Sequence, residues 1–107
     1  MNLEVLLTEH AERDLKQIIR HIAEHDSPAR ARYVLAKIEG SFSRLSDYPS
    51  RGAYPPELSA LGIREFREVF FKPYRIIYRV IGSIVYVTLI ADGRRDMRAI
   101  LERRFLE

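Results

Sequence analysis

Four arginines in the C-terminal half of the chain have the residue type and spacing that could do chemistry: Arg75, Arg79, Arg94 and Arg95. A guanidinium group is permanently charged and presents a planar fork of N–H donors, which suits phosphates and carboxylates. Clustered guanidinium groups could hold phosphates or stabilise a phosphoryl-transfer transition state. The same side chains could equally pair with Glu65, Glu68 and Asp96 in a structural network.

Other chemical motifs are weaker. His21, Glu24 and His25 match the H-x-x-E-H pattern of some zinc proteases. The match is expected to be accidental, because His10 is the sole other histidine and so small a domain has no room for a substrate cleft around a metal. The chain contains no Cys, no G-x-S-x-G motif and no glycine-rich phosphate loop. We therefore expect no metal and no cofactor.

The strands that carry Arg75 and Arg79 are predicted for residues 74–81 and 84–91, on either side of Gly82-Ser83. A two-residue loop that begins with Gly is typical of a type II′ hairpin. This turn predicts the following facing pairs: Ile81 with Ile84, Arg79 with Tyr86, Ile77 with Thr88, and Arg75 with Ile90.

That register divides the hairpin into two faces. The apolar face is expected to form the core beneath the helices, and it contains Tyr74, Ile76, Tyr78, Val80, Val85, Val87, Leu89 and Ala91. The other face mixes arginines with apolar residues, which predicts an exposed binding surface. Because Arg94 and Arg95 directly follow the second strand, we expect several guanidinium groups to converge at one end of that surface.

The preceding residues predict the elements that support this hairpin. A strand is expected at 3–7, followed by a helix that Thr8 caps and that ends near Asp26. Ser27-Pro28 then starts a second helix that continues to Leu45, and the two helices should pack as an antiparallel hairpin. Residues 48–62 form a loop with one helical turn at 57–61, and 63–71 is a strand with a bulge at 69–71.

The C-terminal segment predicts a short helix with the apolar stripe Met97, Ile100, Leu101 and Phe105. The expected fold class is therefore α+β: a strand, a two-helix hairpin and a three-stranded antiparallel meander, with the helices packed on one face of one sheet and a short C-terminal helix after it. Residues 1–107 should form a single domain.

The amino-acid composition limits the kinds of partner and location that we expect. The chain is 47% hydrophobic and 31% charged, with a formal net charge of +3 that permits an anionic partner without demanding one. Its 18 basic residues include only three lysines, so arginine dominates. No long uninterrupted apolar segment is present, which predicts a cytoplasmic protein.

The order of elements and four segments resemble the ParE/RelE superfamily of bacterial type II toxins. The segments are Thr8–Ile19 (TEHAERDLKQII), Tyr48–Gly52 (YPSRG), Pro73–Val80 (PYRIIYRV) and Gly93–Asp96 (GRRD). The resemblance covers nearly the whole chain and implies the RelE/ParE-like fold. It also implies a toxin that a cognate antitoxin, encoded in the adjacent reading frame and ParD-like, silences by direct binding.

The superfamily divides by target. RelE-like members cleave messenger RNA on the ribosome, and the resemblance matches their catalytic arginines to Arg75 and Arg95. Their C-terminal general base falls on or near Leu101, and no Tyr or His follows Tyr86. Glu65 and Glu68 also stand among the basic residues expected on the preceding strand.

These departures favour the ParE-like activity, which is inhibition of DNA gyrase by stalling it on cleaved DNA. Ribosome-dependent mRNA cleavage is the alternative, and a third reading is a protein that has lost toxicity and serves only in repression or plasmid maintenance. The expected target-binding residues are Arg75, Arg79, Arg94, Arg95, Arg98 and Arg103.

Overall fold

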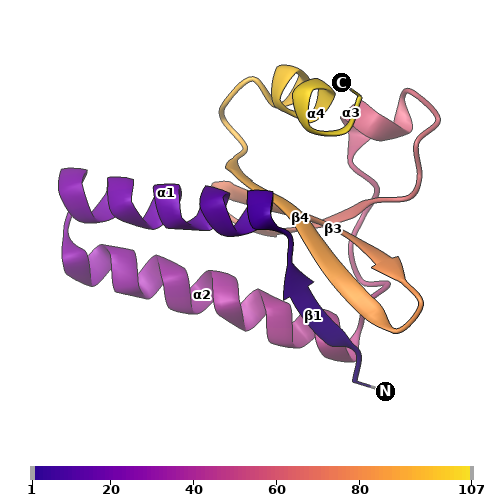
Figure 1. Cartoon of the computed structure of the whole chain (residues 1–107). Coiled ribbons are helices and arrows are strands. Elements are labelled where there is room, and N and C mark those ends of the chain that lie inside the picture. Colours follow the sequence, from indigo (N-terminus) through magenta and orange to yellow (C-terminus); the bar gives the residue numbers. More distant parts are fainter. Residues whose placement is uncertain (1, 107) are drawn as a thin grey trace.

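The chain begins with strand β1 (Glu4–Leu7), which leads into two long helices, α1 (Glu9–His25) and α2 (Pro28–Asp47). The structure is a computed structural model that describes residues 2–106. Thr8 accepts a hydrogen bond from the Ala11 amide at 3.2 Å, and Ser27 accepts one from the Arg30 amide at 3.0 Å. Both predicted caps are confirmed, and the helices pack as the predicted hairpin (Figure 1).

Four strands form one sheet in the order β1-β4-β3-β2, where β2 is Arg67–Phe71, β3 is Tyr74–Ile81 and β4 is Ile84–Asp92. β1 lies parallel to β4, and the other neighbours are antiparallel. Gly82 has a φ of 61°, while no described non-glycine residue has a positive φ, so the turn has the predicted type II′ geometry.

Two expectations about the strands are wrong. β2 begins at Arg67 rather than at residue 63, because Ile63 and Phe66 pack elsewhere, in a second apolar cluster. The bulge expected at 69–71 is absent, since β2 and β3 pair in continuous register from Arg67 to Phe71. The irregularity lies instead in the pairing of β3 with β4, beside Ile77 and Tyr78.

This bulge places Thr88 outside the ladder, so that Tyr78 pairs with Val87 and Ile77 pairs with Leu89. The Thr88 hydroxyl donates to the Ile77 carbonyl oxygen at 3.1 Å and so stabilises the extra residue. The predicted pairs of Ile77 with Thr88 and of Arg75 with Ile90 are therefore wrong. Beyond the bulge every side chain of β4 changes face.

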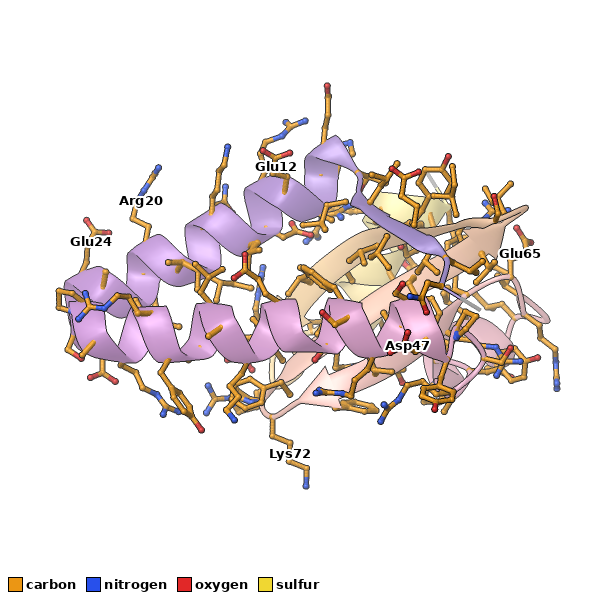
Figure 2. All side chains as sticks on the ribbon, turned by 90° about the horizontal axis from the view of Figure 1, so that it is seen from below. Glu12, Arg20, Glu24, Asp47, Glu65 and Lys72 are labelled. Carbon is orange, nitrogen blue, oxygen red and sulfur yellow. The ribbon has the colours of Figure 1, made fainter. Side chains whose placement is uncertain are left out.

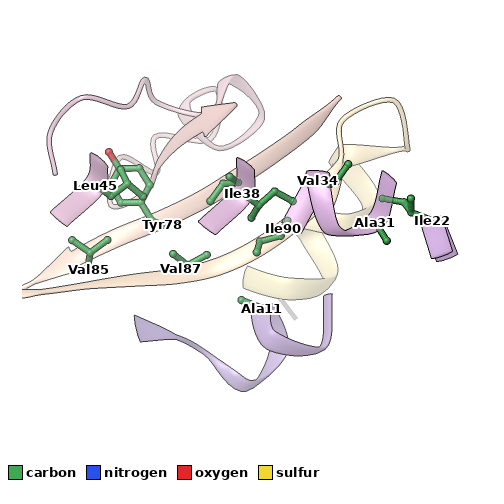
Figure 3. Packing of buried hydrophobic residues seen from close by; sticks show 11 residues of the cluster. Ala11, Ile22, Ala31, Val34, Ile38, Leu45, Tyr78, Val85, Val87 and Ile90 are labelled. Carbon is green, nitrogen blue, oxygen red and sulfur yellow. The ribbon is translucent and has the colours of Figure 1, made fainter. Parts of the chain in front are cut away.

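The change of face decides which residues form the main core, beneath α1 and α2 (Figure 3). Ile90 joins this core, and Leu89 and Ala91 leave it for the opposite face. The outer side of α1 remains polar, with Glu12, Arg20 and Glu24 directed away from α2 (Figure 2). The predicted apolar row is thus confirmed for Tyr74, Ile76, Tyr78, Val85 and Val87. It is wrong for Val80, which is 41% exposed, and for Leu89 and Ala91.

The second face of the sheet is covered as well. Helices α3 (Pro56–Ser59) and α4 (Met97–Phe105) lie against each other over it (Figure 1). A smaller core forms there from Leu58, Phe66, Ile77, Leu89, Ala91, Met97, Ile100 and Leu101. The expected open binding surface is therefore wrong, because these helices supply the apolar partners that the second face needs. No helix of residues 2–106 is long and apolar enough to cross a membrane.

Candidate functional site

Arg75 lies within the protein, between two carboxylates. Its Nε donates to Glu68 Oε1 at 2.7 Å. Its two terminal nitrogens donate to the two carboxylate oxygens of Glu57, at 2.8 and 2.7 Å. The residue is only 8% exposed. This fork ties α3 to β2 and β3, and it uses the donors that a phosphate would need.

The three charges of this cluster respond differently to their surroundings. The hydrogen bond from Arg75 holds the pKa of Glu57 below its usual range. Burial raises the pKa of Glu68, because desolvation outweighs the attraction of the same arginine. The hydrogen bond to Glu57 raises the pKa of Arg75, so the guanidinium group stays charged.

Arg79 and Arg94 lie apart from Arg75. Arg79 Nη2 is 3.6 Å from Glu65 Oε2, and its guanidinium group lies over the Phe66 ring. Arg94 forms an exposed ion pair with Asp92 at 2.6 Å. The expected convergence of Arg75, Arg79 and Arg94 is wrong, because each of them pairs with different carboxylates. The structural network considered from the sequence is present for Glu65 and Glu68, with Glu57 in addition.

Arg95 and Arg103 do come together, at a cavity of about 420 Å³ between α1, the end of β4 and α4. We call it the α1–α4 cavity. Its polar lining also includes His10, Asp14, Gln17 and Arg104. Within residues 2–106, neither Arg95 nor Arg103 forms an ion pair. Their charge is therefore available to a partner.

Asp14 and Arg104 build the wall of this cavity. Asp14 accepts from the Ile90 amide at 3.1 Å, an amide that β1 does not reach. Arg104 donates to both Asp14 carboxylate oxygens, at 3.1 and 2.9 Å, and to the Thr88 carbonyl at 2.7 Å. One ion pair thus fixes α4 to α1 and satisfies the backbone beside the bulge.

Arg98 faces a different hollow, lined by Glu57, Leu58, Ala60, Leu61, Glu102 and Leu106. Its side chain is 84% exposed and lies 3.4 Å from Glu102. Arg94 is exposed as well, with 76% of its side chain accessible. Both arginines can therefore approach a partner, although from outside the α1–α4 cavity.

The position that the resemblance assigns to a catalytic general base lies outside the lining of the α1–α4 cavity. Leu101, where the resemblance puts the general base, is 1% exposed and packs in the smaller core. The sequence offers no Tyr or His after Tyr86 to replace it. RNA cleavage needs a group that removes the 2′-hydroxyl proton, and the leucine side chain at position 101 cannot do so.

Sequence reasoning missed the α1 side of this cavity. Its ion pair joins residues 90 positions apart, which no local pattern reveals. One signal was present, because Asp14 interrupts the apolar helix face between Ala11 and Ile18.

The two histidines of the H-x-x-E-H motif lie at the other end of α1. The His21 and His25 rings stack at 4.2 Å, and His25 Nδ1 donates to the His21 carbonyl at 3.0 Å.

Comparison with known proteins adds independent evidence. The sequence model described as "ParE toxin of type II toxin-antitoxin system, parDE" matches residues 5–97. Toxin ParE3 of Caulobacter vibrioides is 32% identical over 100 residues, which cover 94% of this chain and 96% of that protein. Toxin RelE1 of the same organism is 33% identical over 94 residues, which cover 87% of this chain and 96% of that protein.

Two solved structures share the fold. The chromosomal ParDE toxin-antitoxin system from P. aeruginosa matches with a TM-score of 0.70 and 21% identity, over 84% of this chain and 95% of that one. The toxin-antitoxin complex RelBE2 from Mycobacterium tuberculosis matches with a TM-score of 0.58 and 25% identity, over 86% of this chain and 99% of that one. The predicted α+β toxin fold is confirmed.

Proposed function

This chain belongs to the family of ParE toxins of type II toxin-antitoxin systems, and from that premise we propose that it inhibits DNA gyrase by stalling the enzyme on cleaved DNA. Gyrase inhibition is the activity that the resemblance to ParE-like toxins implies. The protein acts by binding, with no cofactor and no covalent chemistry of its own.

The observation that carries this proposal is the state of the residues that match a ribonuclease site. Arg75 is held by Glu57 and Glu68, and Leu101 is buried where a general base would be required. An RNA phosphate at Arg75 would face two carboxylates in a desolvated setting, which opposes its binding. Binding to a protein target needs neither residue.

The proposed contact surface is the α1–α4 cavity together with the exposed arginines on either side of it. Arg95 and Arg103 offer unpaired charge, and Arg94 and Arg98 offer charge held only in exposed ion pairs. Arginine is enriched where interfaces concentrate their binding energy, and its charge suits an acidic or DNA-bearing partner. Arg75 is excluded from this surface by its burial.

A cognate antitoxin is the second proposed partner. Both solved structures that resemble this chain come from toxin-antitoxin systems, which supports an antitoxin partner in general. We assign it to the ParD-like class because the family match is to the parDE system. Coexpression with the adjacent reading frame should rescue growth and yield a complex.

Ribosome-dependent mRNA cleavage remains the second candidate, because 33% identity to Toxin RelE1 favours it. Expressing the chain without antitoxin separates the two functions. Gyrase stalling breaks DNA, so we expect induction of the SOS response while messenger RNA stays intact. Rapid mRNA cleavage that Arg95→Ala abolishes, with no SOS response, would replace the proposed function with the second candidate.

A further inference from the structure

A cavity of about 380 Å³ opens where β2 begins and β3 ends, and the proposed function makes no use of it. We call it the Tyr54 cavity. It is lined by Pro49, Ser50, Tyr54, Arg64, Glu65, Arg67, Arg79 and Val80. None of these residues lines the α1–α4 cavity. Three guanidinium groups therefore share one hollow with a single carboxylate, so the hollow carries a net positive charge.

Two of these arginines are not fully engaged by other groups of the protein. Arg64 forms no ion pair within the described part of the chain. Arg79 lies 3.6 Å from Glu65, and its Nε is buried with no hydrogen-bond partner. A buried N–H group without an acceptor is uncommon in folded proteins. The Arg79 side chain is 36% accessible overall, so an anionic oxygen in the cavity can approach the accessible part of its guanidinium group.

Arg67 is already held in position. Its Nη1 donates to the Gly52 carbonyl at 2.8 Å, and its Nη2 donates to the Tyr54 hydroxyl at 3.2 Å. The guanidinium groups of Arg67 and Arg64 lie 4.6 and 5.4 Å from the centre of the Tyr54 ring. A guanidinium group fixed on an aromatic ring loses little conformational freedom when it binds a ligand.

The loop that carries Tyr54 contains further arginine and tyrosine residues near the cavity. Tyr48 is 68% exposed and Tyr54 is 37% exposed. A second cavity of about 340 Å³ along the same loop is lined by Arg44 and Arg51 among other residues. On duplex DNA, arginine side chains and tyrosine hydroxyl groups both contact the phosphate backbone.

We propose that the Tyr54 cavity binds phosphodiester groups of DNA, with Arg64, Arg67 and Arg79 as the contacting residues. The choice of DNA rests on the proposed function, because gyrase holds a DNA duplex whose backbone would lie near the bound toxin. The binding itself requires no gyrase. It is therefore tested on the full chain alone, freed of antitoxin.

The experiment measures binding of a short fluorescent DNA duplex by anisotropy over a series of salt concentrations. For three phosphate contacts, log K should fall against log salt with a slope of about −2.7. Arg64→Glu/Arg79→Gln should weaken binding by about tenfold or more and reduce the slope to about −1. Arg64→Glu alone, at an exposed position, should weaken binding by about threefold.

Arg20→Glu/Lys72→Gln is the matched control, because it makes the same charge change at exposed residues away from the cavity (Figure 2). Control and wild type should bind alike, and circular dichroism should show equal folding of all variants. Equal DNA binding by wild type and Arg64→Glu/Arg79→Gln, or none by either, would overturn the inference. So would tighter binding of poly-glutamate or single-stranded RNA. Gyrase inhibition by a wild-type chain that fails this test would leave the proposed function standing.

Discussion

Arg75 is the counter-charge of two carboxylates, and removing it would leave both without a partner. Arg75→Ala should lower the free energy of unfolding by about 3–5 kcal/mol at neutral pH, as breaking a buried ion pair does. Urea unfolding measures this change. Arg98→Ala removes only an exposed pair with Glu102 and should have little effect. Equal stability of the two variants would mean that water reaches Glu57 and Glu68.

The same cluster predicts a pH dependence. Because the pKa of Glu57 is lowered in the fold, chiefly by its hydrogen bond from Arg75, its ionised form stabilises the protein. That stabilisation is present above the ordinary value of 4.5 and is lost as the pH falls through the lowered pKa. Glu57→Gln should therefore be less stable than wild type at neutral pH, with a difference that shrinks in acid. Urea midpoints at several pH values measure it, and a constant difference would contradict the assignment.

Among the elements, α4 depends on a single ion pair for its position on α1. Asp14→Ala removes the acceptor of the Ile90 amide and of Arg104, which should cost about 2 kcal/mol of stability. The Ile90 amide should also lose its protection from hydrogen exchange. Glu12→Ala, in an exposed pair with Lys16 on the same helix, is the control. Unchanged protection of the Ile90 amide would show that its hydrogen bond to Asp14 does not stabilise this part of β4.

Local signals account for the elements that the sequence predicts correctly. Thr8, Ser27 and Gly82 act within a few residues of themselves, so their caps and turn follow from residue type alone. The bulge at Thr88 depends on a cross-strand hydrogen bond and on the distant Asp14. Its absence from the prediction reversed the faces of Leu89 and Ala91, and with them the expected open surface.

The contrast between local signals and long-range contacts also separates the predicted and unpredicted parts of the site. Arg95 and Arg103 were expected at a binding surface from the concentration of arginine near the C-terminus, and they line a common cavity. The burial of Arg75 was not expected, since Glu57 lies in the short helix α3, which no sequence periodicity relates to β3. The role of Arg95 and Arg103 in target binding remains a prediction.

For the protein as a whole, we expect the surface around α4 to carry toxicity. Arg95→Glu/Arg103→Glu should raise the amount of toxin needed to arrest growth by about tenfold or more, because arginine hot spots commonly contribute above about 1 kcal/mol each. Arg20→Glu/Lys72→Glu makes the same charge change elsewhere and should remain toxic. Equal toxicity of the two folded variants would remove the α1–α4 cavity from the target interface.

We propose that this protein stops gyrase rather than cutting RNA. The most direct measurement is the accumulation of cleaved plasmid DNA when purified gyrase is incubated with the folded toxin, freed of antitoxin. We expect cleaved complexes to increase with toxin concentration and supercoiling to fall in parallel, with both effects reversed by the antitoxin. Unchanged supercoiling and no cleaved DNA at micromolar toxin would contradict gyrase inhibition by this protein.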